Sequence, residues 1–299
     1  MKRPVAAARR RRQRGVSLIE LMVSLVIGSF LIIGITQIYI DNQRSYLFQQ
    51  SQSGNQENAR FAEFMLNEYF GKAGYRRAPD QPVEDAFPQR AADTDCEAFK
   101  AGSSITAAKD AIGVCIRYQP LVATELDCQG NAVTSFTDDS IFKPSPPSSL
   151  VVLAIRYRPA TNNEGLENGA LTCKSIGSAD AAAVELLTGV ADMRLDFGLG
   201  KNGMLDKTLK DDNDSSRFVS AATWSDSDGP IRAVRYAILL ASRERLRDSD
   251  GSDDSTGSVV LDKWLEVADD TAKTRLENGD ERRIYQVAQN TRNLRNLMP

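Results

Sequence analysis

One carboxylate stands alone in the most apolar part of the chain. Between residues 16 and 40 the only charged side chain is Glu20, whereas residues 1–15 carry seven basic residues and no acidic one. A charged side chain near the centre of a bilayer costs roughly 2.5–3.5 kcal/mol on insertion. Glu20 therefore needs an interfacial position, a bound proton or a cation at the same depth.

Cleavage of the chain would create such a cation. If the chain is cut after Gly15, Val16 acquires an α-ammonium group four residues before Glu20. In a bundle of such helices, the ammonium of one subunit can meet the Glu20 carboxylate of its neighbour. This ion pair would be favourable in a low dielectric and would fix the axial register of the helices. Ser24 and Gly28 supply small surfaces for close helix packing.

The cysteines are a second group of residues with definite chemistry. The chain has four, all beyond the apolar run, and an even number on the translocated side of a membrane favours two disulfides. There is no C-x-x-C spacing and no histidine, which argues against a zinc site and excludes Ser-His-Asp and Cys-His catalysis. Spacing leaves all three pairings open for Cys96, Cys115, Cys128 and Cys173.

An acidic segment near residue 250 offers possible ligands for Ca²⁺. It begins like an EF-hand loop, but Gly251 stands at position 4 instead of 6, and Val259 occupies position 12, where a glutamate is needed. We therefore expect a solvated loop and no other cofactor. The candidate calcium ligands are Asp248, Asp250, Asp253 and Asp254.

A long helix must position Glu20. At 1.5 Å per residue, residues 16–40 are long enough to cross a bilayer, and the basic cluster predicts that residues 1–15 stay in the cytoplasm. A cleavable secretory signal fits poorly because no A-x-A-like site follows the run. An apolar face at helical spacing continues through Phe61, Phe64 and Phe70, and no proline interrupts residues 5–78. We predict one helix over 16–72.

The rest of the chain, residues 73–299, is predicted to form a β-rich head. Residues 75–110 read as irregular, and strand-like runs follow at 111–118, 150–157, 169–173, 183–187, 190–197, 231–241 and 282–287. The expected fold is α+β, with the long helix packed on an antiparallel sheet. Trp224 and Trp264 are expected in the core or on a sheet face.

The charge balance argues against nucleic-acid binding. Removing the seven basic residues of positions 1–15 lowers the 37 Lys and Arg to 30, against 40 Asp and Glu. A nucleic-acid-binding domain needs a basic surface, which this balance does not favour.

The segment from Gly15 to Glu20, with the apolar run after it, resembles the class III signal of type IV pilins and type II secretion pseudopilins. The resemblance implies that a prepilin peptidase removes residues 1–15 and methylates Val16, and that Glu20 is needed for assembly. Val16 and Gln37 stand where major pilins usually have phenylalanine and a helix-kinking proline. The second departure, Gln37, suggests a minor subunit.

Later segments resemble the PilW family of minor pilins: residues 73–75, 127–131, 171–173, 233–236, 282–285 and 294–296. This resemblance places a disulfide at Cys128–Cys173, which leaves Cys96–Cys115. It implies a non-enzymatic subunit that primes type IV pilus assembly and lies at the tip with other minor pilins and an adhesin. Its further partners would be the major pilin, the prepilin peptidase and the inner-membrane assembly platform.

The resemblance also sets the expected location and the rival functions. Before assembly the chain would span the inner membrane once, with residues 16–40 in lipid and the head in the periplasm; afterwards it would lie at the cell surface. One rival is a minor pseudopilin of a type II secretion system. A rival of another class is a single-pass, membrane-anchored enzyme or cation-binding receptor that is never cleaved.

Overall fold

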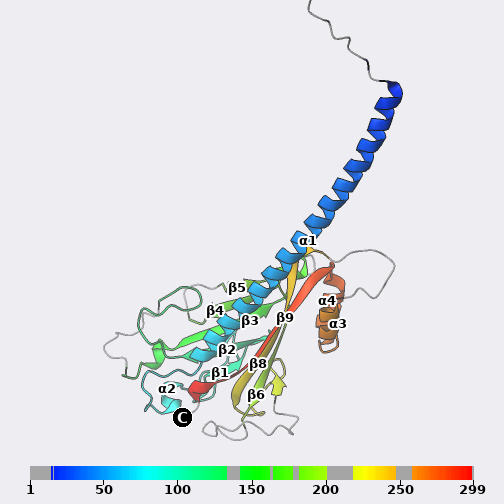
Figure 1. The fold of residues 1–299 in the computed structure, drawn as a ribbon. Helices are drawn as coiled ribbons and strands as arrows, with labels where there is room; N and C mark the ends of the chain where they lie inside the picture. Colours follow the sequence, from blue (N-terminus) through cyan, green and yellow to red (C-terminus); the bar gives the residue numbers. More distant parts are fainter. Residues whose placement is uncertain are drawn as a thin grey trace, which may run out of the picture. The chain divides into compact units, whose positions relative to one another are not determined.

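The protein is described by a computed structural model that covers Gly15 and residues 17–132, 142–161, 164–177, 182–200, 218–246 and 258–297. The chain divides into two compact units, residues 1–49 and 50–299. The helix α1 (Leu18–Lys72) begins in the first unit and ends in the second (Figure 1). Its 55 residues confirm the single long helix predicted from the sequence.

In the first unit, α1 exposes apolar side chains on all sides from Leu18 to Ile40. Its large apolar side chains between Leu18 and Ile40 are 40–78% exposed. The hydroxyls of Ser29 and Thr36 donate to the carbonyl oxygens of Val26 and Ile32 one turn earlier, so they need no outside partner. Within the described residues, α1 is the one helix long and apolar enough to cross a membrane.

The described part of the second unit contains two antiparallel sheets. The first has the order β1-β2-β3-β4-β5 and the second β7-β6-β8-β9. The strands of the first sheet are β1 (Ile105–Ala107), β2 (Gly113–Tyr118), β3 (Val151–Arg158), β4 (Ala170–Ser175) and β5 (Val184–Thr188). Those of the second are β6 (Val190–Leu199), β7 (Phe218–Ser220), β8 (Ile231–Arg245) and β9 (Arg283–Asn293).

The sequence predicted most of these strands, but it did not predict their division into two sheets. The chain changes sheet at Gly189, between β5 and β6. Its φ of 87° lies in the left-handed region that glycine adopts readily, and its N–H donates to the Glu167 carbonyl at 2.9 Å. Two consecutive strands therefore join different sheets without a loop.

The two sheets share one core with the second half of α1. Ala59, Ala62, Leu66 and Phe70 recur every three or four residues and are buried against side chains of both sheets. The Phe70 ring packs on Tyr236 of β8, with 6.0 Å between ring centroids. A helix packed on antiparallel sheets confirms the α+β fold class.

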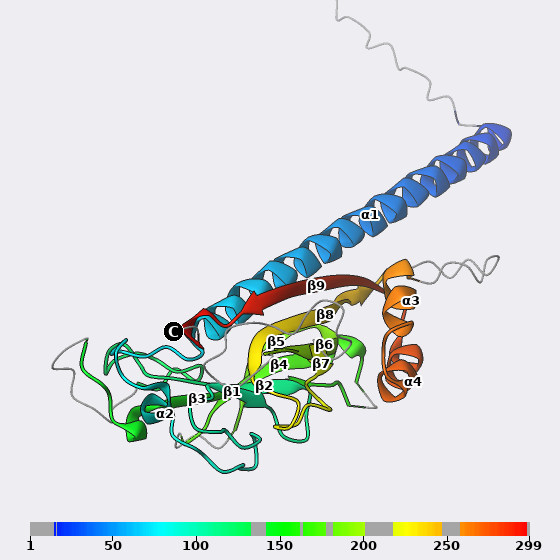
Figure 2. The ribbon, with the colours of Figure 1, turned by 90° about the horizontal axis from the view of Figure 1, so that it is seen from below.

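Two helices that the sequence did not predict cover part of the second sheet, α3 (Val259–Leu265) and α4 (Asp270–Gly279). Figures 1 and 2 show them together at one end of β8 and β9. They begin at Ser258 and Asp269, whose side chains accept hydrogen bonds from backbone N–H groups of the first turn. The remaining short turns are α2 (Val83–Ala86), Pro147–Ser149, Leu166–Asn168 and Arg295–Leu297.

Trp264 is a core residue, as expected, and it lies on α3. Its indole N–H donates to Oδ2 of the buried Asp192 at 2.8 Å, and Arg275 of α4 contacts Oδ1 at 2.5 Å. Burial raises the pKa of Asp192 against the opposing effect of these two partners. One carboxylate of β6 thereby holds both helices on the sheet.

The irregular segment before β1 is organised by the buried side chain of Arg117 on β2. Its guanidinium donates to the carbonyl oxygens of Ser103 and Pro88, both at 2.6 Å, and to those of Phe87 and Lys100 at 3.1 and 3.0 Å. Burial lowers its pKa to about 10. The Arg117 guanidinium therefore supplies hydrogen bonds to backbone carbonyls of this segment that are not paired within a sheet.

We expect Arg117→Met to lower the free energy of unfolding by about 3 kcal/mol or more, because it leaves several buried carbonyls without a donor. Urea denaturation of the full chain in detergent, followed by tryptophan fluorescence, measures the change. The matched control is Arg158→Met, which removes a half-exposed ion pair with Glu185 and should cost under about 1 kcal/mol. Equal losses in the two variants would contradict this role of Arg117.

Candidate assembly site

Glu20 lies in the first turn of α1, with its side chain exposed. The Leu21 N–H donates to the Ser17 carbonyl at 3.1 Å, so the turn that carries Glu20 is formed. A carboxylate in the first turn is favoured by the helix dipole. Gly15 is exposed and Val16 lies outside the described residues, so the ion pair between a Val16 ammonium and Glu20 stays a prediction.

The surface around Glu20 is suited to contact with other helices. The Ser24 hydroxyl donates to the Glu20 carbonyl at 2.7 Å, which satisfies this polar group within the helix. A Cβ at Gly28 or Gly34 would meet nothing within 4 Å, so both positions are open to a neighbour. An exposed carboxylate beside small and apolar side chains can bind a cation carried by another helix.

The second half of α1 is held to the head at two points by side-chain amides. Asn55 donates to the Ile284 carbonyl of β9 at 3.0 Å. Asn296, just after β9, donates to the carbonyls of Gly71 and Ala73 at 2.6 and 3.3 Å, and so caps the C-terminal end of the helix. Gly74 then turns the chain with a φ of 75°. Residues more than 200 positions apart thus fix the end of α1.

Two disulfides bind irregular segments to the first sheet. Cys96–Cys115 joins the segment before β1 to the middle of β2, and Cys128–Cys173 joins the loop after β2 to β4. These are the pairs that the family resemblance implied. No free cysteine is found among the described residues, so the bridges have a structural role.

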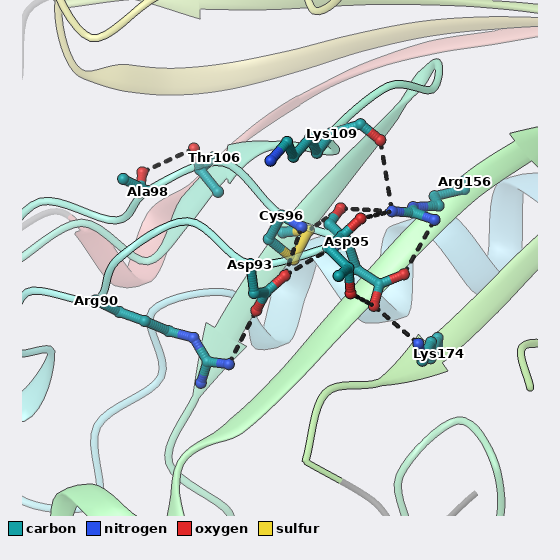
Figure 3. Close-up of a disulfide and its surroundings, with 11 residues drawn as sticks. Arg90, Asp93, Asp95, Cys96, Ala98, Thr106, Lys109, Arg156 and Lys174 are labelled. Atoms are coloured by element: carbon teal, nitrogen blue, oxygen red, sulfur yellow. Dashed lines mark hydrogen bonds and ion pairs between the residues drawn. A yellow bond between two sulfur atoms is a disulfide. The ribbon is translucent and has the colours of Figure 1, made fainter. Parts of the chain in front are cut away.

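A charged network surrounds the first disulfide, as Figure 3 shows. Asp95 accepts from Lys174 of β4 at 2.8 Å and lies 3.0 Å from Arg156 of β3. Asp93 accepts from the backbone N–H groups of Asp95 and Cys96, both at 2.8 Å. Burial alone would raise the pKa of Asp95, but the bonds from Lys174 and Thr94 and the charge of Arg156 hold it below its usual value.

The calcium candidates give no site that can be described. Asp248, Asp250, Asp253 and Asp254 all lie outside the described residues. Elsewhere in the part of the chain that the structure covers, no group of three or more metal-ligating side chains is arranged to hold an ion.

Two family models match the chain, and together they cover more than half of it. The prokaryotic N-terminal methylation motif matches residues 10–36, and type IV pilus-assembly protein W matches residues 156–296. The two matches together support a type IV pilin of the PilW family. A type IV-like pilin from Thermus thermophilus is similar in structure, with a TM-score of 0.35 and 13% identity over 81% of this chain and 96% of that chain. No curated protein matches the sequence.

The matched parts of the chain include both the first turn of α1 and the residues that hold its C-terminal end. The methylation motif spans Gly15, Val16 and Glu20, and the second match runs from the end of β3 to the C-terminal cap. Sequence reasoning noted residues 294–296 as a family resemblance but did not assign the role of Asn296. No local pattern indicates it, because the helix that Asn296 caps ends 224 positions earlier.

The network around the first disulfide should make the head acid-sensitive. Because the pKa of Asp95 is lowered on folding, the unfolded chain takes up this proton first as pH falls. The contribution of ionised Asp95 to the free energy of unfolding is complete above the pKa of an unfolded aspartate, about 3.9. This contribution is lost as pH falls through the lower pKa of Asp95 in the folded chain. Thermal melts between pH 5 and about 2 should show a shallower acid loss of stability in Asp95→Asn. Asp262→Asn, at an exposed site on α3, should keep the wild-type slope; identical slopes in all three proteins would contradict the prediction.

Proposed function

We propose that this PilW-family pilin is a minor subunit that helps to start a type IV pilus and stays at its tip with other minor pilins and an adhesin. The observation that carries the proposal is Glu20, an exposed carboxylate in the first turn of an apolar helix within a matched methylation motif. Such a helix offers both an apolar contact surface and one polar contact that sets register.

The proposed mechanism starts with cleavage after Gly15 and methylation of Val16 by a prepilin peptidase. Helices of several subunits, each spanning residues 16–40, associate in the inner membrane. Glu20 of this subunit then pairs with the N-terminal ammonium of a neighbour. In the low dielectric of the helix bundle this pair disfavours a shifted register, since a shift would leave both charges without partners.

Glu20 also bears on the position of the subunit at the tip. The carboxylate needs a neighbour that supplies an ammonium at its depth, so the subunit docks onto another one. We therefore place this subunit next to the outermost subunit of the pilus, and not in the outermost position itself. The head supports a role in initiation, since two disulfides and a shared core give neighbours a preformed surface before any filament lattice exists.

The first test removes the charge. Glu20→Ala should leave the full-length protein in the membrane at wild-type levels yet reduce surface pili by about tenfold or more, because the register pair is lost. Pili sheared from cells and quantified against membrane-bound protein give the measurement. Ser24→Ala is the control, since its hydroxyl only bonds within the helix, and it should leave piliation unchanged. Normal piliation with Glu20→Ala would refute the register mechanism.

The second test locates the subunit. A small tag in place of Glu277, an exposed residue of α4, should be detected by gold labelling at one end of sheared pili. Mass spectrometry of the membrane-extracted protein should show Val16 as a methylated N-terminus. Label along the whole shaft would contradict a tip position, and an intact residue 1 would contradict the pilin mechanism and favour the uncleaved, membrane-anchored rival.

A further inference from the structure

β9 is an edge strand whose sequence lacks the usual protection, although the Ile284 carbonyl at its start accepts a hydrogen bond from Asn55 of α1. It pairs with β8 on one side, and no described strand pairs with its other side. Exposed edges are commonly protected from other chains by lysine, proline or an inward-pointing charge. Residues 284–291 of β9, Ile-Tyr-Gln-Val-Ala-Gln-Asn-Thr, contain none of these over eight positions. This edge is therefore able to accept a further strand.

The hydrogen-bond phase of the ladder shows which backbone groups face outward. The Leu294 N–H donates to the Arg232 carbonyl at 2.9 Å, and Asn293 lies opposite Ala233. In an antiparallel ladder this assigns the even-numbered residues of β9 to the bonds with β8. Val287 and Gln289 therefore direct their N–H and C=O groups away from β8. The Thr291 N–H, also directed outward, is satisfied by the side chain of Asn290 at 2.8 Å.

A cleft of about 1020 Å³ runs along this edge and has two different walls. Residues 284–287 and 289–291 of β9 line it, with Gln52 and Gln56 of α1 on one side and α3 on the other. Figures 1 and 2 show β9 beside the second half of α1. On the α3 wall, Val259 and Val267 are 72% and 51% exposed. The cleft therefore combines free backbone groups with an uncovered apolar surface.

The charges of the cleft indicate what it would bind. Arg235 on β8 is paired with Asp196 on β6 at 2.9 Å. Arg194, the neighbouring cation on β6, lines the same cleft and makes no ion pair with any described residue. An occupant with a carboxylate in this position would complement the Arg194 cation.

We propose that the β9 edge binds an extended segment of a neighbouring pilus subunit as an added strand. The segment would bond to the backbone of Val287 and Gln289, place apolar side chains against α3 and direct a carboxylate toward Arg194. The identity of the occupant as a pilus subunit rests on the proposed function.

The test compares two substitutions at Gln289 in the full chain, in piliated cells. Gln289→Pro removes one outward N–H while leaving the bonds to β8 in place, whereas Gln289→Ala keeps that N–H and removes only the side chain. A photo-reactive amino acid at Lys263, on the α3 wall, reports the occupant, and the same group at Glu277 on α4 is the matched control position.

We expect an adduct from position 263 that maps by mass spectrometry to one extended segment of another pilus subunit. Gln289→Pro should reduce its yield by about tenfold and Gln289→Ala by less than about twofold. Arg194→Glu leaves the β8–β9 ladder untouched and should reduce the adduct yield by about fivefold. This variant replaces Gln289→Pro as the test of docking if the proline variant does not fold. A thermal melt of each variant identifies a failure to fold.

Equal yields for the proline and alanine variants, or equal adducts from positions 263 and 277, would overturn the strand-docking proposal. So would an adduct that does not respond to Arg194→Glu. If the chain is recovered in sheared pili but position 263 gives no adduct, the docking proposal is overturned and the pilin function is not affected. The folded chain absent from pili in cells that still form them would instead contradict the proposed function.

Discussion

The structure depends on a helix, α1, whose two halves have different apolar surfaces. From Ala59 to Phe70, α1 has one apolar face, and the two sheets bury it. From Leu18 to Ile40 it is apolar on every side, and those side chains stay exposed. At about 25 cal/mol per Å² of apolar surface, leaving such a segment in water is strongly unfavourable. It therefore requires lipid or the helices of other subunits to cover it.

A contact made by such a helix can matter to the head only if the helix is firmly attached to it. Within the second unit that attachment is both apolar and directional. Leu66 and Phe70 contribute burial, while Asn55 and Asn296 supply amide hydrogen bonds to backbone carbonyls. The cap by Asn296 also links the last described segment of the chain to the end of α1. Because Asn296 lies just after β9, this link also holds β9 beside α1. The edge of β9 that does not pair with β8 stays open.

What could be predicted from the sequence was set by local patterns. The 3.6-residue period and the missing prolines predicted α1, and strand-like apolar runs predicted β3, β6 and β8. The division into two sheets depends on one backbone conformation at Gly189, which composition does not reveal. The helix α3 was missed because Val-Val-Leu-Asp-Lys-Trp-Leu is short and rich in residues that also favour strands. Arg117 was missed because its partners are backbone carbonyls, which leave no sequence pattern.

The groups that the chain satisfies internally differ from those that it leaves exposed. Asp192 and Arg117 are buried polar groups, and each has several partners of its own chain. Glu20 and the outer edge of β9 lie at the surface next to apolar residues, where a natural protein normally provides a partner or a protective charge. Arg194 is half-buried in the cleft beside that edge. Buried charges without partners would destabilise the fold, whereas unpaired surface groups beside apolar patches cost the isolated chain little. Such groups become favourable when a neighbour covers them, which is the energetic pattern expected of a subunit that is complete only in its assembly.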